Sequence, residues 1–276
     1  MQKRTFLWQA HCAVFLAAFG FAALTMAQNP PAAPSSTNDD WLAQARKMYY
    51  SSTVSGLKGF DCEMRPNWEA LFLTQNGGQM SATNQAKVTL LGSVKVALHA
   101  RMDGSSVLDW NSPPQQLDAD QTKMLSDMHS ALDQTLVQGF MQFWTPFIER
   151  QVIPDSPSGL EMAATDDGGR KIHIKQPDVE LFETFDNGHI LREYIVVLTG
   201  TKIEITPTYS PSDHGLVITH FHAFIRPADE TQKVQEMNVD VGYQWLEGFP
   251  IPSRLEMEVL GTAQLKLAFE NCTVQH

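Results

Sequence analysis

Two histidines separated by one residue are the first candidates for metal chemistry. His220 and His222 stand in a segment with strand periodicity, so their side chains would project from the same face. Two imidazoles supply only part of the ligand set that a zinc site needs. His173 or an acidic side chain would have to complete it, and no HExxH or paired CxxC pattern accompanies them. We therefore expect structural or surface histidines, with no metal and no other cofactor.

Serines and carboxylates are the next candidates, for hydrolytic chemistry. The GxSxG pattern that exposes a nucleophilic serine is absent, and the serines after Asp103-Gly104 are typical of a hairpin turn. Glu256 and Glu258 would share one face of a strand, where a solvated row is commoner than a glycosidase acid/base pair. The chain also lacks a phosphate-binding loop, a dinucleotide fingerprint and a nucleic-acid motif. These patterns predict a protein that is not an enzyme.

Three cysteines occur, of which Cys62 and Cys272 stand near the two ends of the part expected to fold. In an exported protein a disulfide between them is plausible, and it would place the first strand beside the last. The chain-entropy model assigns about 5 kcal/mol to the long loop that it would close. Two unpaired buried thiols are the alternative. Catalysis by a reactive thiol is not expected, because neither residue has a local CxxC or Cys-His context.

A strongly aromatic stripe is the remaining candidate, for binding rather than catalysis. Apolar residues follow Asp118 at steps of three and four residues, which predicts a long amphipathic helix with Gln121 completing a capping box. The stripe would pack the helix onto a sheet, or it would leave an apolar cavity for an acyl chain between helix and sheet. Its candidate ligand-binding residues are Phe140, Phe143, Trp144 and Phe147.

Composition and the first residues indicate where such a protein would work. The formal net charge of -11 makes nucleic acid and anionic lipid surfaces poor partners, and 43% hydrophobic residues exclude a wholly disordered chain. Residues 1–27 have the pattern of a signal peptide, with Lys3 and Arg4 before an apolar stretch and Ala27 before the cleavage point. We prefer this interpretation to a retained transmembrane anchor, and it predicts a periplasmic or secreted protein. Cys12 would leave with this segment.

The elements that must position these residues form one expected domain. Residues 28–40 are a Pro, Ala and Ser-rich linker, and a single α+β domain is expected over 41–276. Asp39 or Asp40 would cap a first helix that ends at Gly56, and Pro66 would open a short second helix. The helix after Asp118 would be either one rod or a pair, with a bend at Gly139 and a kink or end at Pro146.

The rest of the chain alternates like strands joined by tight turns. Strand periodicity begins near Lys87, and Asn187-Gly188 predicts a two-residue hairpin turn. The prolines of 248–252 predict a stiff corner before a last strand over 255–269 that bends at Gly261. Sequential hairpins predict an antiparallel meander. The expected fold class is therefore α+β, a curved, half-barrel-like antiparallel sheet packed on two or three helices.

This order of elements resembles the LolA/LolB-type half-barrel superfamily of bacterial envelope lipid and lipoprotein carriers. The segment Val241-Gly-Tyr-Gln-Trp-Leu-Glu-Gly-Phe-Pro-Ile-Pro-Ser-Arg resembles that family's late hairpin. The resemblance implies an incomplete barrel plugged by helices, with a hydrophobic small molecule or lipid as the partner. We therefore expect non-enzymatic binding or carriage of a lipid or acyl chain in the cell envelope. The alternative is an envelope scaffold that meets a protein partner and binds no small molecule.

Overall fold

A computed structural model of the chain describes residues 36–75, 79–111, 116–155, 159–229, 231, 233–259 and 263–276. The expected signal peptide over 1–27 and residues 28–35 of the expected linker lie outside these ranges. The described residues divide into two compact units. Unit 1 comprises Ser55–Thr145 and Val241–His276, and unit 2 comprises 36–54 and Pro146–Asp240. Strand β10 contributes residues to both units, so this division does not separate the chain into two independent domains. The expectation of one domain therefore stays a prediction.

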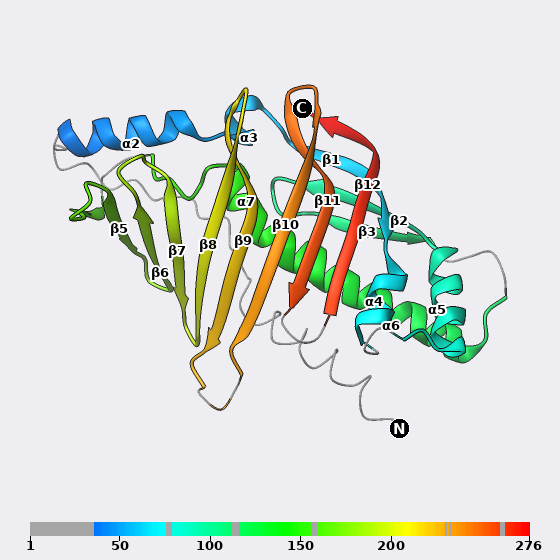
Figure 1. Ribbon diagram of the computed structural model, residues 1–276. Coiled ribbons are helices and arrows are strands. Elements are labelled where there is room, and N and C mark those ends of the chain that lie inside the picture. Colours follow the sequence, from blue (N-terminus) through cyan, green and yellow to red (C-terminus); the bar gives the residue numbers. More distant parts are fainter. Residues whose placement is uncertain are drawn as a thin grey trace. The chain divides into compact units, whose positions relative to one another are not determined.

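Unit 1 combines the first three strands with the last two, and β10 adds its second half. Its strands follow the order β3-β2-β1-β12-β11-β10, and every pair with a described register is antiparallel. The short helices α4 and α5 follow β1 in the chain, and the long helical run starts after β3 (Figure 1). Its elements are β1 (Gly59–Pro66), α4 (Trp68–Gln75), α5 (Ala82–Gly92), β2 (Lys95–Arg101), β3 (Val107–Asn111), α6 (Ala119–Thr135), η2 (Leu136–Phe140), the first part of α7 (Met141–Ile148), β10 (Gln235–Leu246), β11 (Phe249–Val259) and β12 (Ala263–Gln275).

Unit 2 is a meander of consecutive antiparallel strands. Its order runs β10-β9-β8-β7-β6-β5-β4, and α2 lies across the ends of these strands (Figure 1). The order of strands starts at β3 and stops at β4, so the sheet is open. The expected α+β class with a curved antiparallel sheet is thereby confirmed. Its elements are α2 (Ser36–Met48), α3 (Ser52–Ser55), β4 (Leu160–Ala164), β5 (Arg170–Lys175), β6 (Val179–Phe185), β7 (Leu191–Leu198), β8 (Thr201–Ser212) and β9 (Gly215–Pro227).

Local signals placed the long helical run correctly. The Asp118 carboxylate accepts a hydrogen bond from the Gln121 amide, and the Gln121 side chain accepts one from the Asp118 amide, which is the predicted capping box. The run α6-η2-α7 is continuous in the chain. Gly139, where a bend was expected, lies in a π-helical turn, and Pro146 lies inside α7, two residues before its end. None of the helices in the described ranges has the length and apolar character that crossing a membrane requires.

Several local predictions were wrong. α2 begins at Ser36, so its first turn takes in the last residues of the stretch expected as a linker. The expected two-residue turn at Asn187-Gly188 is a longer loop between Phe185 and Leu191, in which the Asp186 carboxylate accepts hydrogen bonds from the amides of Gly188 and Ile190. His189 takes the left-handed conformation there, with φ of 63°.

The third correction concerns the end of the chain. The proline corner belongs to β11, and the segment expected as one bent strand is the hairpin of β11 with β12. The register between these two strands begins only at Arg254, beyond both Pro250 and Pro252. Proline has no amide hydrogen for a ladder, so the proline-bearing start of the strand can extend without this pairing.

Candidate functional site

The candidate site is a buried row of side chains on one face of the unit 2 sheet. Directly opposed residues of antiparallel strands carry their side chains on the same face, so the register defines rows that cross the sheet. One row contains a carboxylate among otherwise uncharged side chains, and the row beside it contains aliphatic residues over six strands. The first row runs Met162, Ile172, Glu183, Tyr194, Ile205, Ala223 and Met237. The second runs Leu160, Ile174, Leu181, Val196, Ile203 and Ile225.

Glu183 is the one acidic residue in these two rows, and it is buried. Its side chain is 1% exposed, and neither carboxylate oxygen has a hydrogen-bond partner among the residues that the structure describes. Burial raises the pKa of Glu183 well above its ordinary value. Burial thus favours the protonated form of this carboxyl group, whose O–H donor and carbonyl acceptor are both left unmatched. Such unmatched groups are rare in protein interiors and point to a function.

Two tyrosines lie near Glu183, and one arginine stands in the row beside it. Tyr194 stands opposite it on β7, and burial, followed by the charge of Glu183, raises the pKa of that phenol. Tyr49 is already satisfied, because its hydroxyl donates to the His189 carbonyl at 3.0 Å and accepts from the Leu191 amide at 2.7 Å. Arg170 belongs to the adjacent row of the inner face, with its guanidinium 5.8 Å from the centre of the Trp41 ring.

The inner face is covered unevenly. Toward β8 and β9, Ile205 is 1% exposed and Ala223 is fully buried. Toward the β4 edge the apolar side chains are only half-buried, and along β6 exposure decreases from Val179 and Leu181 to the buried Glu183 and Phe185. Half-buried apolar residues of this face include Leu160, Met162, Val179, Leu181 and Leu198. The apolar surface beside Glu183 is thus accessible from the Val179 side.

The predicted aromatic stripe is divided between the two units. Phe140 stacks on Trp144 with ring centroids 5.8 Å apart, and the Trp144 indole N–H donates to the Tyr243 hydroxyl at 2.8 Å. These residues and Phe143 belong to unit 1 and are buried. Phe147 belongs to unit 2, where its ring lies edge-on to Tyr194 at 5.6 Å. Phe140, Phe143 and Trp144 are packed inside unit 1, whereas Phe147 lies beside the row that contains Glu183.

A second carboxyl group with a raised pKa lies in unit 2. Glu149 follows α7 and is half-buried, and burial raises its pKa to about 7 although the Gln151 amide donates a hydrogen bond that opposes the shift. The Ser51 hydroxyl donates to the backbone carbonyl of the same residue at 3.3 Å.

This shift makes a prediction for the dependence of stability on pH. Between pH 4.5 and about 7 the folded state keeps a proton on Glu149 that the unfolded state releases, so the free energy of unfolding should fall as pH rises through this range. Urea denaturation of Glu149→Gln should show a shallower fall than the wild type. Carbon NMR of the Glu149 carboxyl provides a direct check, and a midpoint near pH 4.5 would contradict the prediction.

The histidines engage carboxylates across the strands. His220 Nδ1 lies 2.9 Å from Asp240, and His222 Nε2 lies 2.8 Å from Glu236. The proposed third ligand, His173, pairs instead with Glu161 at 3.0 Å. Within the described ranges no group of three or more histidine, cysteine or acidic side chains is arranged to hold a metal ion.

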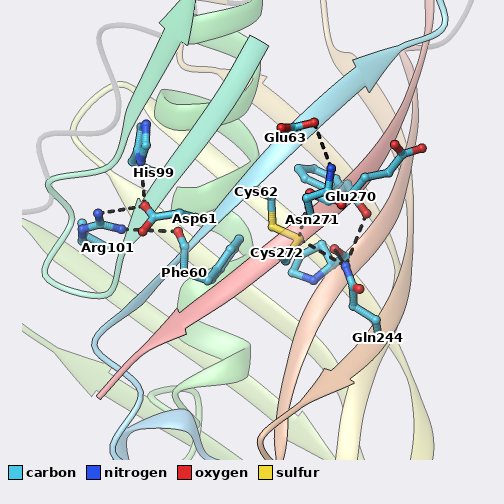
Figure 2. The surroundings of a disulfide bond; sticks show 12 residues. Phe60, Asp61, Cys62, Glu63, His99, Arg101, Gln244, Glu270, Asn271 and Cys272 are labelled. Atoms are coloured by element: carbon cyan, nitrogen blue, oxygen red, sulfur yellow. Dashed lines mark hydrogen bonds and ion pairs between the residues drawn. A yellow bond between two sulfur atoms is a disulfide. The ribbon is translucent and has the colours of Figure 1, made fainter. Parts of the chain in front are cut away.

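The disulfide between Cys62 and Cys272 is present and joins β1 to β12 in unit 1 (Figure 2). The register shifts there, because Asp61 pairs with Thr273 while Glu63 pairs with Glu270, leaving two residues opposite Cys62. Asn271 occupies this bulge with a positive φ of 50°, and its side-chain amide donates to Glu63 at 3.0 Å. The bridge therefore fixes an irregular point of the pairing between the first and last strands.

A charged network lies beside the disulfide (Figure 2). Asp61 accepts hydrogen bonds from Arg101 at 2.9 Å and from Gln275 at 2.7 Å, and it contacts His99 at 2.6 Å. Burial opposes ionisation of Asp61, but these hydrogen bonds outweigh it and lower the pKa. The contact with Asp61 is the main cause of the raised pKa of His99. Each polar group is matched within the network, which is typical of a structural ion-pair cluster.

Glu183 was not predicted as a functional residue. Its only sequence signal is its position in phase with Val179, Leu181 and Phe185, on the face of β6 that alternation makes apolar. The chain matches no protein-family model, and no curated protein sequence matches it. The function of this chain is therefore inferred from its own geometry.

Proposed function

We propose that this chain is an exported, non-enzymatic protein that binds a lipid or acyl chain on the inner face of the unit 2 sheet. The supporting observation is the set of half-buried apolar side chains, Leu160, Met162, Val179 and Leu181, beside the buried Glu183. Apolar surface removed from water contributes roughly 25 cal/mol per Å², so an acyl chain lying on this face would be held mainly by burial. Phe147 would border the same site through its contact with Tyr194.

Two further features are consistent with this proposal. An open antiparallel sheet with helices is the architecture that the resemblance to LolA/LolB-type carriers implies. The disulfide fits an oxidising compartment such as the periplasm, where such carriers work. The unit 1 aromatic residues Phe140, Phe143 and Trp144 remain predicted ligand contacts that the proposed site does not require.

The test is native mass spectrometry of the mature protein purified from a periplasmic preparation, followed by lipid extraction. The wild type should carry stoichiometric lipid. Leu181→Arg should reduce the bound lipid at least about tenfold, because an arginine on the inner face would have to bury its charge against the acyl chain. Ile195→Arg is the matched control, since Ile195 projects from the opposite face of the neighbouring strand and its substitution should leave the lipid in place.

Two outcomes would overturn the proposal: a wild-type mass equal to that of the bare polypeptide, or equal loss of lipid in both variants. The alternative function, an envelope scaffold that binds a protein partner, would then be preferred to lipid binding. In that case a protein partner would be sought at the open strand edges of β3 and β4.

A further inference from the structure

No residue in the described part of the chain forms a hydrogen bond with the Glu183 carboxyl group. The carboxyl group presents two oxygens on the inner face, and both lack a partner there. Tyr49, whose pKa is raised by burial and in small part by the charge of Glu183, already has a donor and an acceptor for its hydroxyl. The Arg170 guanidinium lies over Trp41 and donates to the Gly169 carbonyl at 2.8 Å. A bound ligand would satisfy these groups without rearranging the described residues.

The surroundings of Glu183 favour a neutral group over a cation. An amine would form an ion pair in an interior composed of Ile172, Tyr194 and Leu181, and both charges would have to leave water. Two neutral partners avoid most of that desolvation penalty. A protonated carboxyl offers one donor and one acceptor side by side, so its best complement also has one of each.

We infer that Glu183 binds the polar head of an acyl chain and that this head, like a primary amide or a protonated carboxylic acid, carries both a hydrogen-bond donor and an acceptor. The inference deepens the proposed function and rests on it. Exposure along β6 orients the ligand, because the buried end of the strand holds Glu183 and Phe185 while Leu181 and Val179 are half-buried. The head would lie at Glu183 and the chain would lie over Leu181 and Val179 toward the accessible side.

The experiment measures binding of three probes with the same alkyl chain but different heads. Decanamide has a donor and an acceptor, methyl decanoate has acceptors only, and decylamine is a cation. Isothermal titration at pH 6.5 should give the wild-type protein at least about tenfold tighter binding of the amide than of the ester, as expected when one buried hydrogen-bonding group is left unmatched.

Two variants separate the role of the head from that of the chain. Glu183→Gln keeps one donor and one acceptor at the same place and should retain the preference for the amide. Glu183→Leu removes both and should bind the amide and the ester equally, while still binding the ester about as well as the wild type does. A variant that merely failed to fold would lose the ester as well.

The outcomes distinguish this inference from the proposed function. Equal binding of amide and ester by the wild type, or an unchanged preference in Glu183→Leu, would overturn the role of Glu183 while the apolar site stands. Tightest binding of decylamine, lost in Glu183→Gln, would make Glu183 a charged counter-ion and would also overturn it. If none of the three probes binds to any variant, the proposed function itself fails.

Discussion

Removal of the disulfide by the double substitution Cys62→Ala and Cys272→Ala should lower the free energy of unfolding by about 3 to 5 kcal/mol. The two cysteines are 210 residues apart in the sequence, and they join the two chain segments that make up unit 1. Without the bridge, the covalent connection between these segments runs only through Pro146–Asp240 of unit 2. The unfolded chain then gains the freedom of a very long loop, which stabilises the unfolded state.

Urea denaturation with and without a thiol reductant checks this effect. The reductant should destabilise the wild type by about as much as the double substitution does, and it should leave the double variant unchanged. Hydrogen exchange should show greater loss of protection in β1 and β12 than in β5 to β8, because the bridge lies wholly in unit 1. A wild-type unfolding midpoint insensitive to complete reduction would contradict the prediction.

The elements that the sequence predicted well depend on short-range chemistry. The Asp118 capping box needs only residues three positions apart, and the hairpin of β2 with β3 needs a turn at Asp103-Gly104 between two alternating segments. The pairing of β1 with β12 joins the two ends of the fold, yet the two cysteines indicated it because a disulfide requires proximity. Long-range pairing was thus predictable where a covalent constraint marked it.

The errors arise where tertiary structure outweighs local preference. Pro250 and Pro252 predicted a corner, but their part of β11 lies outside the register with β12 and therefore tolerates them. The helix α5, Ala82–Gly92, overlaps the segment in which strand periodicity was expected from Lys87. Its buried residues Leu90 and Leu91 are adjacent, so they give no helical period.

The candidate site was the least predictable part of the molecule. The sequence places Glu183 on an apolar face of a strand. The alternation of side chains does not reveal which carboxylates on such faces are left without a hydrogen-bond partner when the sheet forms. That property depends on seven strands in register, which bring Ile172 and Tyr194 to either side of Glu183. A glutamate among apolar residues in a strand is therefore a signal to examine, and only the assembled sheet distinguishes a solvated carboxylate from a buried one.

Glu183→Leu should raise the free energy of unfolding at pH 7 by about 2 kcal/mol, because a buried polar group without a partner is replaced by an apolar side chain of similar size. The effect should grow with pH. The pKa of Glu183 is raised in the folded state, so from about pH 4.5 upward the unfolded state gains stability by ionising, while the folded state ionises only at higher pH. Tyr194 and Tyr49, which lie near the carboxyl group, have raised pKa values and stay neutral throughout this range.

Urea denaturation at pH 4.5, 7 and 8.5 distinguishes the two contributions to this effect. Glu183→Gln removes the titration but keeps an unmatched polar group, so it should flatten the pH dependence and stabilise less than leucine does. Glu193→Gln on the exposed side of β7 is the matched control and should change little. If Glu183→Leu is less stable than the wild type at every pH, the carboxyl group has a partner in the folded protein. A variant that gains stability and loses its preference for the amide probe would instead indicate that the buried carboxyl group is retained for binding at the expense of stability.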